Sequence, residues 1–182
     1  MKHDNSGGIP QQKQTSPRTG AAIKPVLTQT ASNTTLWIGH LQTDPADHYG
    51  GQTFVCPAEG RLDNIQLFAT AIPVAGELLL TLHAFDTKQR SWGPVLAQTS
   101  RLVNADDRNN WLSFSMPDIA LEKGLCYGFR IQARQGLVAL AEAACDNKHP
   151  FGFGQEWSAD SLNQQGHYYS FFSLAFKVEM RA

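Results

Sequence analysis

The chain has 182 residues, a length typical of one domain of ordinary size with or without a tail. Hydrophobic residues make up 42% and charged residues only 17%, a composition that excludes a wholly disordered chain. Fifteen basic and sixteen acidic residues give a formal charge of -1 at pH 7. Nucleic acid is therefore not expected as a partner, because phosphate neutralisation requires an excess of basic residues.

The first 35 residues differ in composition from the rest of the chain. Residues 1–35 are mainly Gln, Thr, Ser, Pro, Gly and Lys, which predicts a flexible arm because little apolar surface can be buried. No apolar run follows the positive charge near the start, so we expect no signal peptide and a cytoplasmic protein as synthesised, or an extracellular one if a signal was trimmed. The apolar stretches are too short to span a bilayer, so no membrane insertion is expected.

From residue 36 onward, apolar side chains alternate with others at a period of two, which is typical of half-buried strands. No window keeps a helical period over three turns, and turn-forming residues separate the alternating segments. The segments predicted to be strands are 36–41, 52–56, 65–70, 77–84, 95–103, 111–116, 125–133, 137–142 and 172–180.

Many short strands at regular spacing predict an all-β fold. We expect an antiparallel β-sandwich of the jelly-roll type over residues 36–182, with about eight or nine strands, because two sheets can each bury one face against the other. One long irregular stretch, residues 143–168, is rich in Asn, Gly, His, Gln and aromatic residues. Loops of this length are usually functional or disordered.

Three groups of motifs occur in order along the chain. They are Gly51-Gln52-Thr53-Phe54 with Leu62–Phe68, Trp111-Leu112-Ser113-Phe114 with Leu121–Gly124 and Tyr127-Gly128-Phe129, and His149–Gly154 with Leu174–Val178. Together they resemble a jelly-roll β-sandwich module, lectin-like or carbohydrate-binding-like, of bacterial surface and secreted proteins and phage tail proteins. The resemblance covers residues 50–180 and implies a non-catalytic domain that is often adhesive and sometimes purely structural. The polar arm and the expected lack of a signal peptide depart from that pattern and favour a component of a particle.

The sequence contains none of the common catalytic motifs. It has no GxSxG and no HExxH, and the six histidines have no metal-ligand spacing. A carboxylate pair can still form in the fold, because strands bring distant residues together and the sequence hides this. We predict no enzymatic activity and no catalytic residue.

Asp106 and Asp107 supply clustered oxygen atoms of the kind that calcium prefers, but their spacing matches no known calcium loop. A turn whose side chains bond to the local backbone explains the same residues. We predict no metal or other cofactor and keep these two aspartates as weak candidates for a structural calcium site. Cys56, Cys126 and Cys145 form no CxxC pair, so neither a cysteine-rich zinc site nor a disulfide scaffold is expected.

The best candidates for ligand binding are aromatic, because flat rings stack on the apolar faces of sugars and also anchor protein interfaces. Trp92 lies in a predicted turn, and Trp157 lies in the long irregular stretch before Tyr168 and Tyr169. If these rings gather on the surface, polar neighbours can bond ligand hydroxyls. The alternative is that the aromatic residues only pin the loop to the sandwich. The predicted ligand-binding residues are Trp157, Trp92, Tyr168, Tyr169, Phe153, Gln155, Glu156 and Asn147.

Two functions fit these observations. The first is a non-catalytic recognition module that binds glycan or another surface ligand as part of a phage tail, an injection machine or an adhesin. The alternative is a structural or adaptor subunit in which residues 1–35 dock onto a neighbouring subunit and become ordered there.

Overall fold

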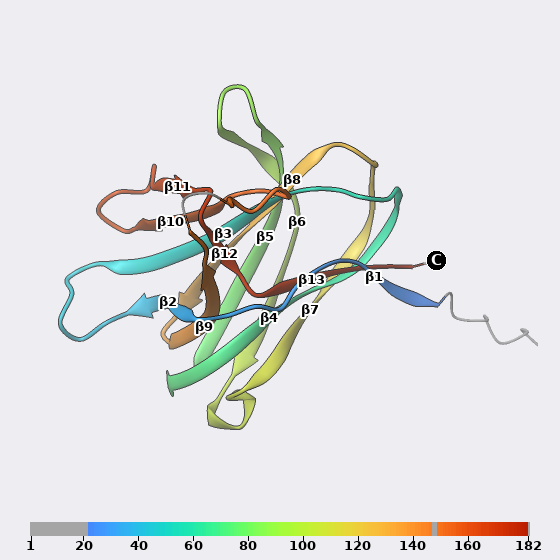
Figure 1. Cartoon of the computed structure of the whole chain (residues 1–182). Helices are drawn as coiled ribbons and strands as arrows, with labels where there is room; N and C mark the ends of the chain where they lie inside the picture. The colour runs from blue at the N-terminus through green and yellow to red at the C-terminus, as the bar shows by residue number, and fades with distance from the viewer. Residues whose placement is uncertain (1–21, 147–148, 182) are drawn as a thin grey trace, which may run out of the picture.

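The computed structural model describes residues 22–146 and 149–181, which are mainly β-strand (Figure 1). A short 3₁₀ helix, η1 (Ala105–Asp107), lies between β6 and β7. The strands are β1 (Ile23–Gln29), β2 (Thr34–His40), β3 (Asp47–Val55), β4 (Gly60–Val74), β5 (Gly76–Asp86), β6 (Ser91–Val103), β7 (Asn110–Leu121), β8 (Cys126–Arg134), β9 (Leu137–Ala144), β10 (Glu156–Asp160), β11 (His167–Tyr169), β12 (Phe172–Leu174) and β13 (Phe176–Arg181).

The prediction of an all-β antiparallel fold is confirmed, but the described residues contain thirteen strands rather than eight or nine. Two of the additional strands, β10 and most of β11, lie in the stretch 143–168 that was predicted to be irregular. Its residues show no clear alternation, and they form strands because β10 pairs with both β3 and β11.

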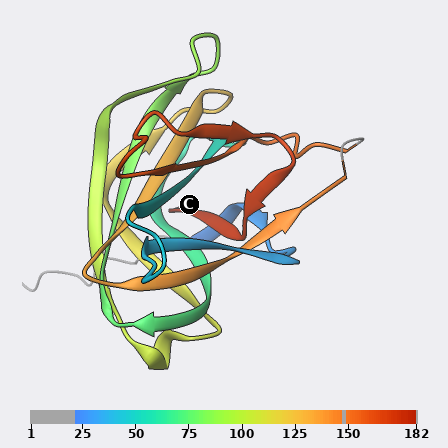
Figure 2. The same cartoon turned by 90° about the vertical axis from the view of Figure 1, so that its left-hand side faces the viewer.

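The strands form one connected hydrogen-bonded network rather than the two separate sheets of the predicted jelly roll. The main path runs β1-β13-β4-β9-β2-β3-β8-β5-β6, and β7, β10, β11 and β12 branch from it. The 15-residue strand β4 explains this connection. Its first part pairs with β13 and β7, and its last part, from Ala69 to Val74, pairs with β9 through register shifts. The network curls into a β-sandwich-like fold, with β5 and β6 in green along one side of Figure 2.

The core is filled by residues that alternate along opposing strands. Phe176 lies at its centre, with its ring centroid 6.2 Å from that of Phe54 and 5.7 Å from that of Phe129. All three rings are fully buried, and each such burial stabilises the fold by about 2 kcal/mol. Because strand residues alternate between faces, the neighbours of Phe54 and Phe129 point to the outer surface, where the candidate site lies.

The expected arm of residues 1–35 is wrong for its last part. Residues 23–29 form β1, which pairs with β13 from Ile23 opposite Arg181 to Gln29 opposite Phe176. Val26 and Leu27 pack against the core. The composition of residues 1–35 did not predict this strand, because its backbone hydrogen bonds are made with β13, which is distant in the sequence, and only two of its side chains pack against the core. The domain therefore starts before residue 36, and residues 1–21 of the predicted arm lie outside the described residues.

Within residues 22–146 and 149–181, no helix is long and apolar enough to cross a membrane.

The packing of β1 predicts the effect of a single substitution. Leu27→Ala removes a half-buried side chain from the core edge, so we expect a loss of about 1–2 kcal/mol in the free energy of unfolding, measured by urea denaturation. The control is Thr28→Ala, because Thr28 is exposed on the same strand. If both variants are as stable as the wild type, Leu27 does not contribute to the core, and residues 23–29 belong to a flexible arm.

Candidate functional site

A row of residues crosses the outer face of the sheet at the level of Arg130. Arg130 of β8 lies opposite Gly51 of β3 on one side and Thr81 of β5 on the other. Gly51 in turn lies opposite Trp157 of β10, which lies opposite Tyr168 of β11. Directly opposed residues lie on the same face, so the side chains of Thr81, Arg130, Trp157 and Tyr168 share one face, with the side-chain-free Gly51 between Arg130 and Trp157.

The guanidinium group of Arg130 lies against two tryptophan rings. Its Cζ atom is 4.1 Å from the ring centroid of Trp157 and 5.2 Å from that of Trp92, which is in the second position of β6. The two tryptophan rings meet edge to face at 5.6 Å, and the Tyr168 ring stacks on Trp92 at 6.3 Å. These four residues, Trp92, Arg130, Trp157 and Tyr168, are named the Arg130 cluster below.

Glycines make room for the rings of this cluster. A Cβ atom on Gly128 would lie 2.6 Å from the Trp92 ring, and one on Gly51 would lie 3.2 Å from the Trp157 ring. Gly166 has a φ of +65°, and a Cβ atom there would lie 2.6 Å from Nε1 of Trp157. The rings therefore pack closely on the backbone, and a side chain at Gly128 or Gly166 would overlap them.

Arg130 carries a positive charge that no acidic side chain balances among the residues that the structure describes. Its Nε atom is buried and has no hydrogen-bond acceptor there. Burial lowers the pKa of Arg130, and the nearby Tyr168 acts in the opposite direction. A guanidinium group stays charged at neutral pH, so the aromatic faces are the main favourable contact of this half-buried cation.

Two hollows meet at Arg130. A cavity of about 170 Å³ lies between Arg130, Trp157 and Tyr49. An open groove of about 840 Å³, named the Arg130 groove below, is lined by Trp92, Arg130 and Tyr168 together with neighbouring glutamines. Arg130 and the exposed Gln164 line both hollows, and no Asp or Glu lines either of them among the described residues.

The structure brings together three of the predicted ligand-binding residues, Trp92, Trp157 and Tyr168, and Tyr169 lines the same groove. Trp92 and Tyr168 are half-buried, and Tyr169 is exposed. The interpretation of Trp157 as a surface ring is wrong, since it is only 2% exposed and its indole N–H donates to the backbone oxygen of Gln165 at 3.0 Å. Trp157 is therefore a buried ring that packs against the guanidinium group of Arg130.

The other predicted residues that the structure describes do not line the Arg130 groove. Phe153 packs against Phe176 of the core and borders a separate hollow of about 460 Å³, as expected if this ring pins the loop. Gln155 also borders that hollow, and its Nε2 donates to Ser170 Oγ at 2.5 Å. Glu156 is only 2% exposed, so its prediction as a partner of ligand hydroxyls is wrong. Asn147 lies outside the described residues.

Glu156 instead forms a buried carboxyl pair with Glu142 of β9, which is 6% exposed. Burial, and then the hydrogen bond to Glu142 and its charge, raise the pKa of Glu156 from 4.5 to about 10. A pKa this high keeps Glu156 mostly protonated at neutral pH. Neither residue lines the cavity or the groove at Arg130, so the pair does not meet a ligand there as paired catalytic carboxylates would.

The weak calcium candidates lie in a turn whose polar groups bond to one another. Asn104 Oδ1 accepts from the backbone N–H of Asp106 at 2.8 Å, and Asp107 Oδ1 accepts from Arg101 Nη2 at 2.6 Å. These contacts match the backbone-bonded turn that was the alternative reading of Asp106 and Asp107. Over residues 22–146 and 149–181, no group of three or more His, Cys, Asp or Glu is placed to hold a metal ion.

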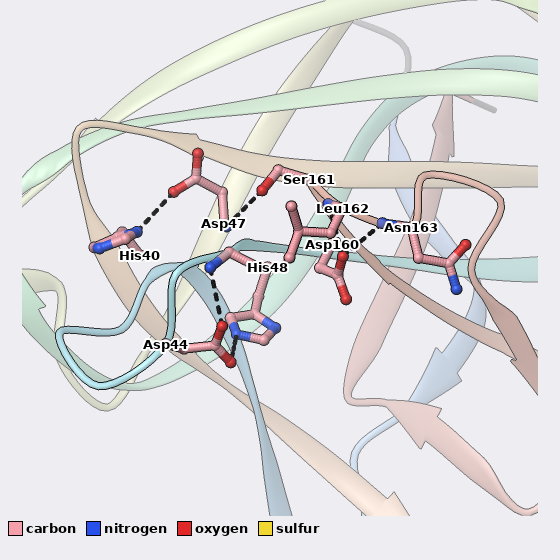
Figure 3. A network of polar contacts seen from close by, with 9 residues as sticks. His40, Asp44, Asp47, His48, Asp160, Ser161, Leu162 and Asn163 are labelled. Atoms are coloured by element: carbon pink, nitrogen blue, oxygen red, sulfur yellow. Dashed lines mark hydrogen bonds and ion pairs between the residues drawn. The ribbon is translucent and has the colours of Figure 1, made fainter.

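A second polar network joins the turn before β3 to the turn after β10 (Figure 3). His48 Nε2 lies 3.0 Å from Asp44 Oδ2, and a backbone hydrogen bond from Ala46, followed by the contact with His48, lowers the pKa of Asp44. The backbone N–H of Asp47 donates to Ser161 Oγ at 3.0 Å, and that of Ser161 donates to the Asp47 carbonyl oxygen at 2.9 Å. These bonds hold the β10–β11 hairpin, which carries Trp157 and Tyr168, against β3.

Neither the protein-family models nor the curated proteins that were searched gave a match to this chain. The resemblance to a lectin-like module therefore stays a prediction that rests on the motifs alone.

Sequence reasoning missed Arg130. Its position was visible, because it alternates with Phe129 and Ile131 in the predicted strand 125–133 and so had to face outward. The local pattern could not show that Arg130 contacts both Trp92 and Trp157, because these two residues are 65 positions apart in the chain.

Gly128→Ala tests the close packing of Trp92 on β8. The added methyl group would overlap the ring, so we expect a loss of about 1–3 kcal/mol of stability and a changed near-ultraviolet circular dichroism spectrum. Gly152→Ala is the control, since a Cβ atom there has nothing within 4 Å. A Gly128→Ala protein with the wild-type spectrum and stability would contradict this packing.

The carboxyl pair predicts a pH dependence of stability. Because Glu156 has a higher pKa in the folded protein than in the unfolded chain, its contribution is complete below pH 4.5 and decreases as the pH rises toward 10. Glu156→Gln keeps a neutral group there, so its Tm should equal that of the wild type near pH 4 and exceed it increasingly from pH 6 to pH 9. Thermal unfolding across this range measures the difference, and parallel curves for the two proteins would disprove a protonated Glu156.

Proposed function

We propose that this protein is a non-catalytic recognition module that binds a glycan in the Arg130 groove. The observation that carries the proposal is the composition of this groove. Half-buried Tyr168 and Trp92 offer aromatic faces or edges, while Ser91, Gln164 and Gln165 offer hydroxyl and amide groups. Sugars need this combination, because their C–H faces pack on rings while their hydroxyl groups need polar partners.

The shape of the groove supports an extended ligand. It is a wide, open hollow of about 840 Å³ on the outer face of the sheet, whereas the adjoining cavity is about five times smaller. The exposed Arg90 borders the groove, with its Cζ atom 5.1 Å from the ring centroid of Tyr168. A chain of sugar units can lie along such a surface with its ends in solvent.

The close packing beneath Arg130 also supports recognition. The indole N–H of Trp157 is hydrogen-bonded to the backbone of Gln165, and Gly51 and Gly128 leave the space in which the rings pack on the backbone. A preorganised surface loses little conformational entropy when it binds. The resemblance to lectin-like modules favours the same function, and we propose that the module acts in a larger assembly such as a phage tail, an injection machine or an adhesin.

A glycan array tests the proposal with the full-length protein and two variants. Tyr168→Ala removes a ring from the groove, so we expect about a tenfold or greater loss of affinity, or about 1.4 kcal/mol or more. The control is Trp111→Ala, because Trp111 is also half-buried and also holds a cation, with Lys177 Nζ 4.0 Å from its ring centroid, but it does not line the groove.

Circular dichroism establishes that each variant is folded. If the wild-type protein binds no glycan on a broad array, the result contradicts the proposal and favours the adaptor function. A folded Tyr168→Ala protein that binds each wild-type ligand unchanged would move the binding site elsewhere.

A further inference from the structure

Arg130 differs from four other described arginines in what balances its charge. Four described arginines form an ion pair with a carboxylate: Arg61 with Asp118, Arg101 with Asp107, Arg134 with Glu77 and Arg181 with Asp63. Arg130 contacts two tryptophan rings instead, and its buried Nε has no acceptor among the described residues. A charged group that is partly removed from water is normally paired, and the half-buried Arg130 has no carboxylate partner among the described residues.

The walls around Arg130 favour an anion. No Asp or Glu lines the cavity or the groove within the described parts of the chain, although the protein as a whole has a formal charge of -1. Arg90 adds a second cation at the rim of the groove. Positive charge in a partly desolvated hollow attracts anions more strongly than the same charge on an open surface.

The stacking of Arg130 leaves it able to bind in its own plane. A guanidinium group that rests on an aromatic ring uses its flat face for that contact, whereas its N–H groups point outward at the edge. Two parallel N–H groups match the two oxygens of a carboxylate. Tyr168 and Trp92 line the same groove, so an acidic group at Arg130 places the rest of a bound sugar beside these rings.

We infer that the Arg130 groove selects acidic glycans, with the carboxylate of a uronic or other acidic sugar bound by Arg130 and the sugar ring packed against Tyr168 or Trp92. This inference rests on the proposed function and adds the class of ligand. Arg130 makes no covalent change in the ligand and acts as its recognition group.

The first test changes the ligand and leaves the protein intact. The wild-type, full-length protein is titrated with matched pairs: oligogalacturonate and its methyl ester, and sialylated and desialylated oligosaccharides. Removal of the charge should weaken binding about tenfold or more, and the acidic ligands should bind less tightly as salt increases.

Equal binding of acidic and neutral forms, lost in Tyr168→Ala, would overturn the charge selectivity and leave glycan binding in place. Binding of neither form, with silence on the array, would overturn the proposed function itself. Tighter binding of dextran sulfate than of every carboxylated ligand would overturn the assignment of a carboxylate.

The second test changes the arginine. Arg130→Gln should lose about tenfold or more in affinity for the acidic ligand, and Arg130→Lys should lie between it and the wild type, because lysine keeps the charge without the paired geometry. Arg134→Gln is the control, since Arg134 belongs to the same strand but is paired with Glu77, and its affinity should stay within about twofold.

Thermal unfolding and near-ultraviolet circular dichroism identify variants that are folded. A folded Arg130→Gln protein with wild-type affinity for the acidic ligand would overturn the inference. If Arg130→Gln does not fold, the matched ligand pairs on the wild-type protein decide the question without it.

Discussion

The alternation of side chains along β3 and β8 is the constraint on which both the core and the site depend. Phe54 and Phe129 point into the core, while Arg130 points outward and Gly51 occupies the outward-facing position opposite it. A register slip of one residue would put the Arg130 charge into the core and a phenylalanine on the surface. Burial of the aromatic core therefore fixes the strand register, and the register in turn aligns Trp157, Gly51 and Arg130 in one row.

The geometry of the Arg130 cluster depends on glycines in the sheet as well as on the aromatic rings. Gly51 and Gly128 leave the space in which two indole rings lie on the sheet. The rings have different positions. Trp157 is buried against the guanidinium group of Arg130, whereas the half-buried Trp92 and Tyr168 line the open groove. A cation held by aromatic rings in this way retains N–H groups for hydrogen bonds.

The β10–β11 hairpin links the groove to the interior. Glu156 and Trp157 are neighbours on β10, and alternation sends the first into the fold toward Glu142 and the second toward Arg130. The protonated Glu156 tolerates burial at neutral pH but makes this part of the fold sensitive to alkali. At the far end of the hairpin, the bonds between Asp47 and Ser161 tie it to β3. Groove geometry and local stability are thus set by the same short element.

The sequence by itself determined the antiparallel all-β class, because a period of two is a local property that burial of one face imposes on each strand. It also indicated Trp92, Trp157 and Tyr168 as candidate binding residues but left open whether the rings lie on the surface or pin the loop, and Trp157 is buried. Only the tertiary structure decided that β1 pairs with β13, that Glu156 is buried near Glu142, and that Arg130 lies at the centre of the candidate site. These features depend on contacts between strands that are distant in the chain, and neither composition nor periodicity records which strands become neighbours.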